Sequence, residues 1–126
     1  MSLGWLAVGL GAALGAWLRW GLALVMHGWH NQLPLGTVAV NLGGGYLIGI
    51  ALAFFQNHPT LPPEWRLFAI TGFLGGLTTF STFSAESMTL LQNGDYLWVL
   101  THALLHVLGA LLLCIAGYAS FRALMA

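Results

Sequence analysis

Four long apolar stretches dominate this chain, and each is about as long as the hydrocarbon core of a bilayer is thick. A membrane-spanning helix needs about 20 consecutive, mostly apolar residues. The stretches lie at residues 3–26, 35–55, 65–91 and 96–121, and the polar or proline-rich segments between them are short. We therefore expect one all-α transmembrane domain over residues 1–126, in which successive helices are antiparallel neighbours.

The scarcity of charged residues supports this interpretation. Of the 126 residues, 59% are hydrophobic and 5% are charged, with three basic and three acidic side chains. A soluble domain carries about a quarter charged residues, because its surface faces water. Lipid must therefore be the main solvent of an integral membrane protein. The balanced charge also argues against a nucleic-acid partner, which would call for a basic patch.

The arginines define the orientation in the membrane only weakly. With an even number of spans, both termini lie on one face, and Arg66 and Arg122 share that face with them. The positive-inside rule then favours cytoplasmic termini, but Arg19 lies late in the first stretch and points the other way. A chain with so small a bias can insert in both orientations.

The third stretch contains a polar, glycine-rich segment from Gly72 to Ser84. Within it, the pair Gly75-Gly76 and the pair Thr78-Thr79 fall near the middle of the bilayer, and both pairs are poor helix formers. Non-helical backbone at this depth persists only where protein buries it or where it lines water. An interruption would expose carbonyls to a cation, and the restarting helix would present amide hydrogens to an anion. The alternative is a kinked helix whose hydroxyls bond to the preceding turn.

Two phenylalanines follow this segment on one helical face. Phe80 and Phe83 are three residues apart, which makes them neighbours on a helix. The edge of an aromatic ring carries partial positive charge and can face an anion. Hydroxyl donors surround the two rings, at Ser81, Thr82 and Ser84. The combination suits a small, strongly hydrated anion, although simple packing of both rings is the alternative.

The remaining polar groups inside the stretches allow more than one role. Asn41, beside three glycines, either bonds a neighbouring helix or lines a cavity. Glu86 could carry protons or pair with Arg19 or a histidine. His102 and His106 have the i, i+4 spacing of metal ligands, but no third ligand is obvious, so we predict no zinc site. No nucleophile motif occurs, and we predict no enzyme.

Pairs of glycines at a spacing of four residues predict close packing between helices. These pairs are Gly11 with Gly15, Gly45 with Gly49, and Gly72 with Gly76. Four thin helices enclose little volume, so a pore or a carrier would need a second subunit.

These motifs resemble the Fluc family of fluoride channels, the CrcB-like proteins. Residues 11–19 look like the family's first glycine–arginine motif, with Ala12 where a second glycine is common. Residues 36–49 around Asn41 look like its second motif. The specific signature is Gly-Gly-Leu-Thr-Thr-Phe-Ser-Thr-Phe within residues 72–86. The fourth stretch has no comparably strong motif, and His106 stands where the family often has tyrosine.

The resemblance implies a fluoride-selective channel that exports fluoride passively across the plasma (inner) membrane of a prokaryote. It implies an antiparallel, dual-topology homodimer with two pores, and a structural sodium ion held by the backbone carbonyls of Gly75 and Thr78 from both subunits. The implied pore residues are Asn41, Phe80, Ser81, Thr82, Phe83, Ser84 and His106. Arg19 and Glu86 are implied as vestibule or polar support.

Two other functions fit a chain of this size. Small proton-coupled drug exporters are also four-span, dual-topology dimers, but they resemble this chain less because their essential glutamate lies in the first helix, which here contains no acid. A structural membrane subunit without transport of its own would need only continuous helices, so the polar segment argues against it.

Overall fold

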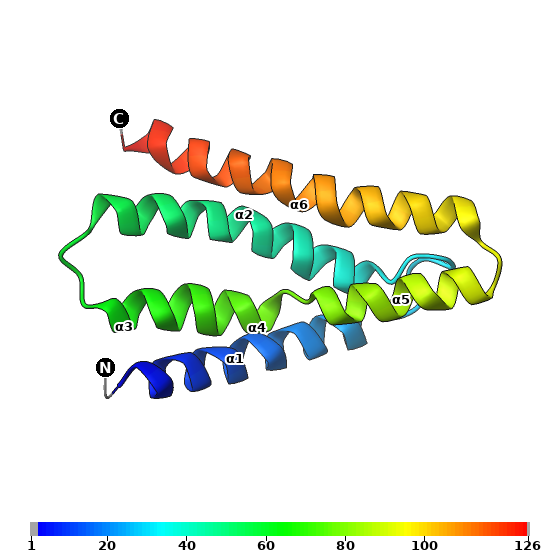
Figure 1. Cartoon of the computed structure of the whole chain (residues 1–126), viewed down its shortest axis with the longest axis horizontal. Helices are drawn as coiled ribbons and strands as arrows, with labels where there is room; N and C mark the ends of the chain where they lie inside the picture. The colour runs from blue at the N-terminus through cyan, green and yellow to red at the C-terminus, as the bar shows by residue number, and fades with distance from the viewer. Residues whose placement is uncertain (1–2, 126) are drawn as a thin grey trace.

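The computed structural model describes residues 3–125 and is helical through almost all of that range. Four of its helices, counting the composite third one as a single span, are long and apolar enough to cross a membrane. Figure 1 shows them as elongated rods side by side, with both termini at the same end. The elements are α1 (Gly4–Val25), α2 (Leu35–Asn57), α3 (Pro63–Arg66), η1 (Leu67–Leu74), α4 (Gly75–Leu77), α5 (Phe80–Gln92) and α6 (Tyr96–Leu124). The predicted all-α class and four spans are confirmed.

The loops contain the residues that start and stop these helices. Pro63 opens α3 at a position where its missing N–H costs nothing, and Glu64 lies in the first turn, where its charge complements the helix dipole. Gly94 follows α5 with φ +76°, a left-handed conformation that other residues rarely adopt. The short polar segment between the third and fourth spans therefore forms a turn at Gly94.

Glycines bring the helices together as predicted. The closest helix pairs are α2 with α6, and α1 with η1 and α4. A Cβ atom at Gly15 of α1 would overlap the carbonyl oxygen of Phe73 and lie 2.7 Å from the Leu77 nitrogen. A Cβ atom at Gly49 of α2 would overlap the backbone of Cys114 in α6. These backbones approach each other because no side chain separates them.

Large apolar side chains face outward along the whole bundle. Trp5 is 72% exposed and Leu112 is 63% exposed. A soluble protein of this size would bury such groups. The buried apolar residues are Leu33, Val40, Ala53, Leu74, Leu77, Phe83 and Leu90. The exterior therefore suits lipid or a second protein chain rather than water.

The interruption of the third span is shorter than the sequence predicts. Thr78 (φ −86°, ψ 154°) and Thr79 (φ −151°, ψ 121°) are extended, and the span is slightly bent there (Figure 1). The expectation that the glycine pair also leaves the helix is wrong, because Gly75 and Gly76 belong to α4. Gly76 instead packs against the backbone of Ala12, which its lack of a side chain permits. The Thr78 hydroxyl donates to the preceding turn, at the Leu74 carbonyl 2.9 Å away.

Asn41 of α2 holds the interrupted backbone in place. Its Nδ2 donates to the Thr79 carbonyl at 2.9 Å, and the Thr79 N–H donates to its Oδ1 at 2.7 Å. The Thr79 hydroxyl accepts from the Thr82 N–H at 3.1 Å and caps the restarting helix α5. Of the two roles considered for Asn41, the hydrogen bond to a neighbouring segment is present, and it satisfies both backbone groups of Thr79.

We expect Gly15→Ala to destabilise the protein by about 1–3 kcal/mol, because the added methyl must push α1 away from the third span. Thermal unfolding in detergent, followed by tryptophan fluorescence, measures the effect. Gly9→Ala is the matched control on the same helix, since a Cβ atom there meets nothing within 4 Å. Equal unfolding temperatures for both variants would show that the contact at Gly15 contributes nothing.

We expect Asn41→Ala to lower stability by about 1–3 kcal/mol for each Thr79 backbone group left without a partner. The same unfolding measurement applies. Asn57→Ala removes the same amide from the exposed end of α2 and should leave stability nearly unchanged. If Asn41→Ala and the control Asn57→Ala unfold at the same temperature, the interrupted backbone does not depend on the Asn41 side chain.

Candidate functional site: an aromatic and amide-lined pocket at the helix interruption

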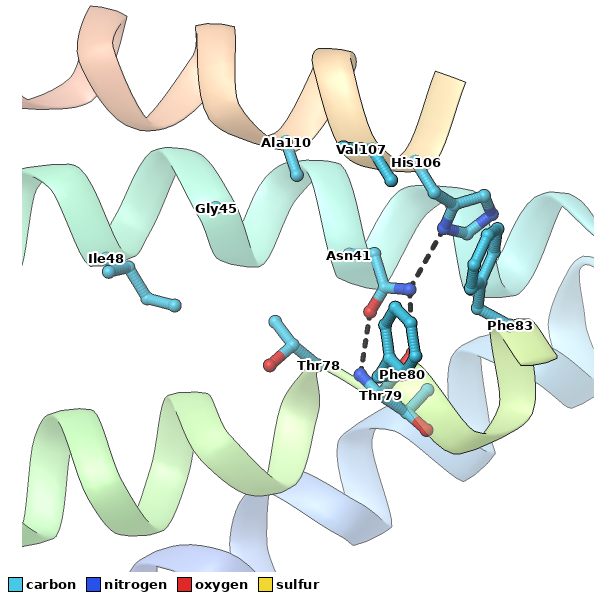
Figure 2. Close-up of a pocket in the computed structure, with 10 residues that line it drawn as sticks. All are labelled: Asn41, Gly45, Ile48, Thr78, Thr79, Phe80, Phe83, His106, Val107 and Ala110. Carbon is cyan, nitrogen blue, oxygen red and sulfur yellow. Dashed lines mark hydrogen bonds between the residues drawn. The ribbon is translucent and has the colours of Figure 1, made fainter. Parts of the chain in front are cut away.

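A cavity of about 290 Å³ lies beside the interruption, between α2, α5 and α6 (Figure 2). Its lining residues are Asn41, Gly45, Ile48, Thr78, Thr79, Phe80, Phe83, His106, Val107 and Ala110. The structure thus brings together four of the predicted pore residues, Asn41, Phe80, Phe83 and His106. They come from three helices that are far apart in the sequence.

The two phenylalanines occupy different environments within this pocket. Phe83 is 8% exposed, whereas Phe80 is 74% exposed. Their ring centroids are 5.4 Å apart and the rings are tilted by 49°. Phe83 also contacts His102 and His106, each with a centroid distance of 4.8 Å. Phe83 therefore forms part of the inner wall, and Phe80 lies at the surface of the subunit.

The hydrogen bonds of Asn41 determine the tautomer of His106. Because Thr79 fixes both amide atoms of Asn41, it is the NH₂ group that faces His106 Nδ1, at 3.0 Å (Figure 2). An NH₂ group donates only, so Nδ1 must accept, and the proton of the neutral ring lies on Nε2. Every hydrogen-bonding direction of Asn41 towards the pocket is then in use. An anion that binds this amide must replace His106 Nδ1 as the acceptor of the second Asn41 hydrogen bond.

The predicted hydroxyl residues lie outside this pocket. Ser81 and Ser84 are exposed on α5, and Ser84 Oγ donates to the Phe80 carbonyl at 2.9 Å. Thr82 bonds the Thr79 hydroxyl at 3.2 Å and lines a separate cavity together with Glu86. The structure therefore divides the predicted pore residues between the Asn41 pocket, the surface of α5 and a second cavity.

Arg19 lies beneath the interruption, away from Glu86. Its Nε donates to the Gly76 carbonyl at 3.1 Å, at the end of α4, where a cation complements the helix dipole. The neighbouring carbonyls of Gly75 and Thr78 accept no hydrogen bond from the part of the chain that the structure describes. Gly75 is exposed and Thr78 is half-buried.

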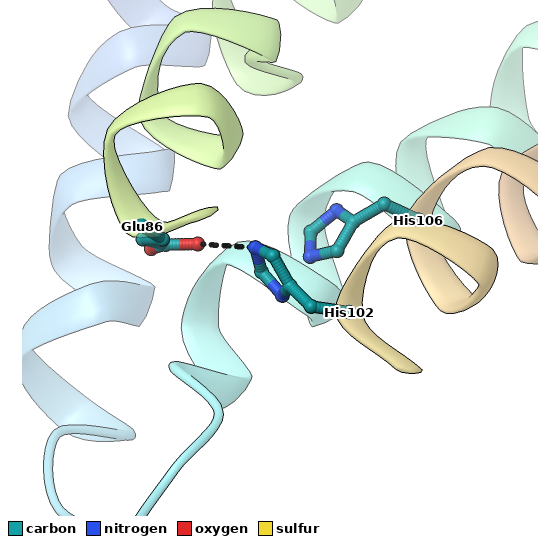
Figure 3. Close-up of side chains that lie close together, drawn as sticks. All are labelled: Glu86, His102 and His106. Carbon is teal, nitrogen blue, oxygen red and sulfur yellow. Dashed lines mark ion pairs between the residues drawn. The ribbon is translucent and has the colours of Figure 1, made fainter. Parts of the chain in front are cut away.

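A second polar cluster lies behind Phe83 and consists of Glu86, His102 and His106 (Figure 3). Glu86 Oε1 lies 3.4 Å from His102 Nε2, and the two histidine rings are 4.4 Å apart. Potential ligand atoms of the three residues all lie within 4.8 Å of one another. The expectation that the histidines lack a third ligand is therefore wrong, because α5 supplies Glu86. Of the partners considered for Glu86, the structure selects a histidine.

The sequence missed two residues of this region as site residues. Thr37 donates its hydroxyl to Glu86 Oε2 at 2.6 Å, and His102 is completely buried. The i, i+4 spacing of His102 and His106 was the available signal for His102. Nothing in the sequence distinguished Thr37 from the other threonines of the chain.

Known proteins show the same pattern over nearly the whole chain. The family described as "CrcB-like protein, Camphor Resistance (CrcB)" matches residues 6–118. The fluoride-specific ion channel FluC of Cupriavidus pinatubonensis is 60% identical over 97% of both chains. Its counterpart in Pseudomonas putida is 58% identical over 92% of this chain and 91% of that protein. The counterpart in Ralstonia pickettii is 55% identical over 96% of both chains. This four-helix integral membrane protein belongs to the CrcB-like family.

Proposed function

We propose that this chain is a fluoride-selective ion channel that lets fluoride leave a bacterial cell passively across the plasma membrane. The observation that carries the proposal is the pocket at the interruption, where Phe80 and Phe83 face the amide of Asn41. The names of the similar bacterial proteins, fluoride-specific ion channels, agree with it. The family is one of ion channels, so the chain is not an enzyme.

The pocket can replace part of the water that surrounds a fluoride ion. Aromatic ring edges attract an anion and exclude water from it. Asn41 contributes the hydrogen now given to His106 Nδ1, because its other hydrogen holds Thr79. A neutral hydrogen bond contributes about 1 kcal/mol net, so the exchange of one such bond for a bond to an anion is favourable. Asn41 can therefore serve both the backbone and the ion.

The hydroxyls of Ser81, Thr82 and Ser84 extend the polar path along α5 in this proposal. Ser81 and Ser84 lie on the exposed side of the helix, and Phe80 is exposed beside them. These groups need a cover to form the wall of a pore. A second copy of the chain is the cover we propose, with Arg19 and Glu86 as polar support at the ends of the path.

The second copy would be antiparallel, which gives a homodimer with two pores. The arginine distribution supports this arrangement, because it favours neither orientation strongly. The outward-facing apolar side chains supply the surface that a partner subunit and lipid would cover. Close contacts through small residues, as seen within the subunit, can join two such bundles.

The carbonyls of Gly75 and Thr78 fit the structural sodium ion that this family implies. They accept no hydrogen bond within the described chain, and Arg19 already satisfies the Gly76 carbonyl between them. Two-fold pairing would double the number of available oxygens without any carboxylate. When bound, the ion supplies positive charge that offsets part of the cost of bringing anions into a narrow pore.

Passive transport is sufficient for the proposed role. Hydrogen fluoride is a weak acid that crosses membranes in its neutral form and ionises in a less acidic cell interior. The ion then accumulates inside, and a channel that passes fluoride but retains chloride allows it to flow out. No structural feature of the described residues favours the drug-exporter alternative, since α1 has no acid and Glu86 is held by Thr37.

We expect the purified protein alone, in liposomes loaded with potassium fluoride, to release fluoride when valinomycin balances the charge. A fluoride electrode measures the efflux, and liposomes loaded with chloride are the control. Equal efflux of both ions, or no fluoride efflux from correctly folded protein, would contradict the proposal. The absence of any conduction would favour a structural membrane subunit.

We expect Phe80→Ile to slow fluoride efflux about tenfold, which corresponds to roughly 1.4 kcal/mol of lost ring-edge interaction. Phe80 is exposed at the pocket, so the change should leave the fold intact. Phe55→Ile is the matched control, because Phe55 lies at the far end of α2 and lines no part of this pocket. An unchanged rate for Phe80→Ile would remove the aromatic rings from the mechanism.

A further inference from the structure

The buried polar atoms without a hydrogen-bond partner all gather in one place in the described part of the chain. They are Glu86 Oε1, His102 Nδ1, His102 Nε2 and His106 Nε2. Glu86 Oε1 and His102 Nε2 lie 3.4 Å apart, an ion-pair contact rather than a hydrogen bond. A buried polar atom without a hydrogen-bond partner destabilises the fold, and such atoms are rare in folded proteins. The Asn41 pocket does not account for the three atoms on Glu86 and His102, because neither residue lines it; only His106 is shared with that pocket. Because these unpartnered atoms lie together, we expect the cluster to bind a ligand.

We propose that Glu86, His102 and His106 form a binding site for a divalent transition-metal ion, with Zn²⁺ as the best match. Two imidazole nitrogens and one carboxylate oxygen are a common donor set for zinc, with a water as fourth ligand. In a tetrahedral zinc site with bonds of about 2.0–2.2 Å, two ligand atoms lie about 3.4 Å apart. The potential ligand atoms here lie within 4.8 Å of one another, so the three side chains must rotate inward by about 1 Å to close the site.

The surroundings already orient these ligands. The Thr37 hydroxyl donates to Glu86 Oε2 at 2.6 Å. Glu86 Oε1 is left directed at His102 (Figure 3). The Phe83 ring stacks on His102 with an interplanar angle of 26° and restricts its rotation. Hydrogen bonds and packing of this kind behind the ligands strengthen metal sites in proteins.

An ion can reach the cluster from the end of the bundle. Glu86 lines a cavity of about 480 Å³ that is also bounded by the loop before α2, at residues 26–28 and 30–34. This loop connects two of the helices that are long and apolar enough to cross a membrane, so we place it at an aqueous end of the bundle. The carboxylate of Glu86 is therefore the first ligand that an incoming cation meets.

Metal binding must compete with the hydrogen bond between Asn41 and His106. If the metal takes His106 Nε2, the ring proton moves to Nδ1, which then faces the Asn41 NH₂ group and can no longer accept. The loss of one neutral hydrogen bond is small compared with the binding free energy of structural zinc, so it does not prevent binding. Asn41 keeps both of its bonds to Thr79.

Binding can be measured without any transport assay. Untagged protein in detergent is titrated with Zn²⁺ by calorimetry, and with Co²⁺ by visible absorption, whose intensity reports low coordination. We expect one ion per chain and intense Co²⁺ bands. No saturable binding, or weak bands typical of fully hydrated Co²⁺, would overturn the proposal. This result does not depend on whether the chain conducts fluoride.

Variants assign the ligands. His102→Gln and Glu86→Gln should each weaken Zn²⁺ binding more than tenfold, and Thr37→Val should weaken it about tenfold through the orientation of Glu86. His58→Gln is the matched control, because His58 is exposed at the far end of α2. Size-exclusion chromatography checks that each variant is folded. Equal affinity in His102→Gln and His58→Gln would place the metal elsewhere and overturn the site.

A second measurement rests on the proposed channel function. A metal bound to His106 and packed against Phe83 would hold two walls of the Asn41 pocket rigid. We expect micromolar Zn²⁺ to reduce fluoride efflux several-fold and a chelator to restore it, with no inhibition in His102→Gln relative to its own metal-free rate. Metal binding without inhibition would confirm the site but remove its influence on the pocket. Inhibition that persists in His102→Gln would contradict the site.

Discussion

The pairing of Asn41 with the backbone of Thr79 is the interaction on which the rest of this structure depends. Hydrocarbon offers no hydrogen bonds, so an interrupted helix can exist within it only if other groups satisfy the freed backbone. The Asn41 amide does this with one donor and one acceptor, at 2.9 and 2.7 Å. It thereby permits the extended residues Thr78 and Thr79, which turn Phe80 to the surface and Phe83 inward. The Asn41 pocket is therefore a consequence of these two hydrogen bonds.

Much of this arrangement could be predicted from residue types alone, because the bilayer imposes few solutions. The length of the apolar stretches predicts the four spans, and the spacing of the glycines predicts the close helix pairs. The polar segment is significant because it lies near the middle of the third apolar stretch. Asn41, Phe80 and Phe83 were predicted as site residues for physical reasons and lie around one cavity. Span ends differ from the predicted ones by a few residues, because caps and loops rather than hydrophobicity determine where a helix stops.

The features that could not be predicted depend on which sides of neighbouring helices contact each other. The glycine pair at 75–76 is flexible in isolation, but the contact of Gly76 with Ala12 keeps it helical, and the interruption moves to the next residues. The same limitation applies to Glu86. Its position next to His102 follows from the rotation of α5 against α6, which no local pattern encodes. Thr37 becomes significant only because Glu86 lies opposite it.

One continuous set of contacts links the interrupted backbone to the metal-ligand cluster. Asn41 holds Thr79 with one amide hydrogen and gives the other to His106, whose second nitrogen points into the cluster. Any ligand that claims His106 Nε2 therefore changes what Asn41 can offer to an ion in the pocket, and an ion bound by Asn41 releases His106 Nδ1. An anion at Asn41 and a cation at His106 both displace the same hydrogen bond. The two sites are thus coupled through one shared hydrogen bond.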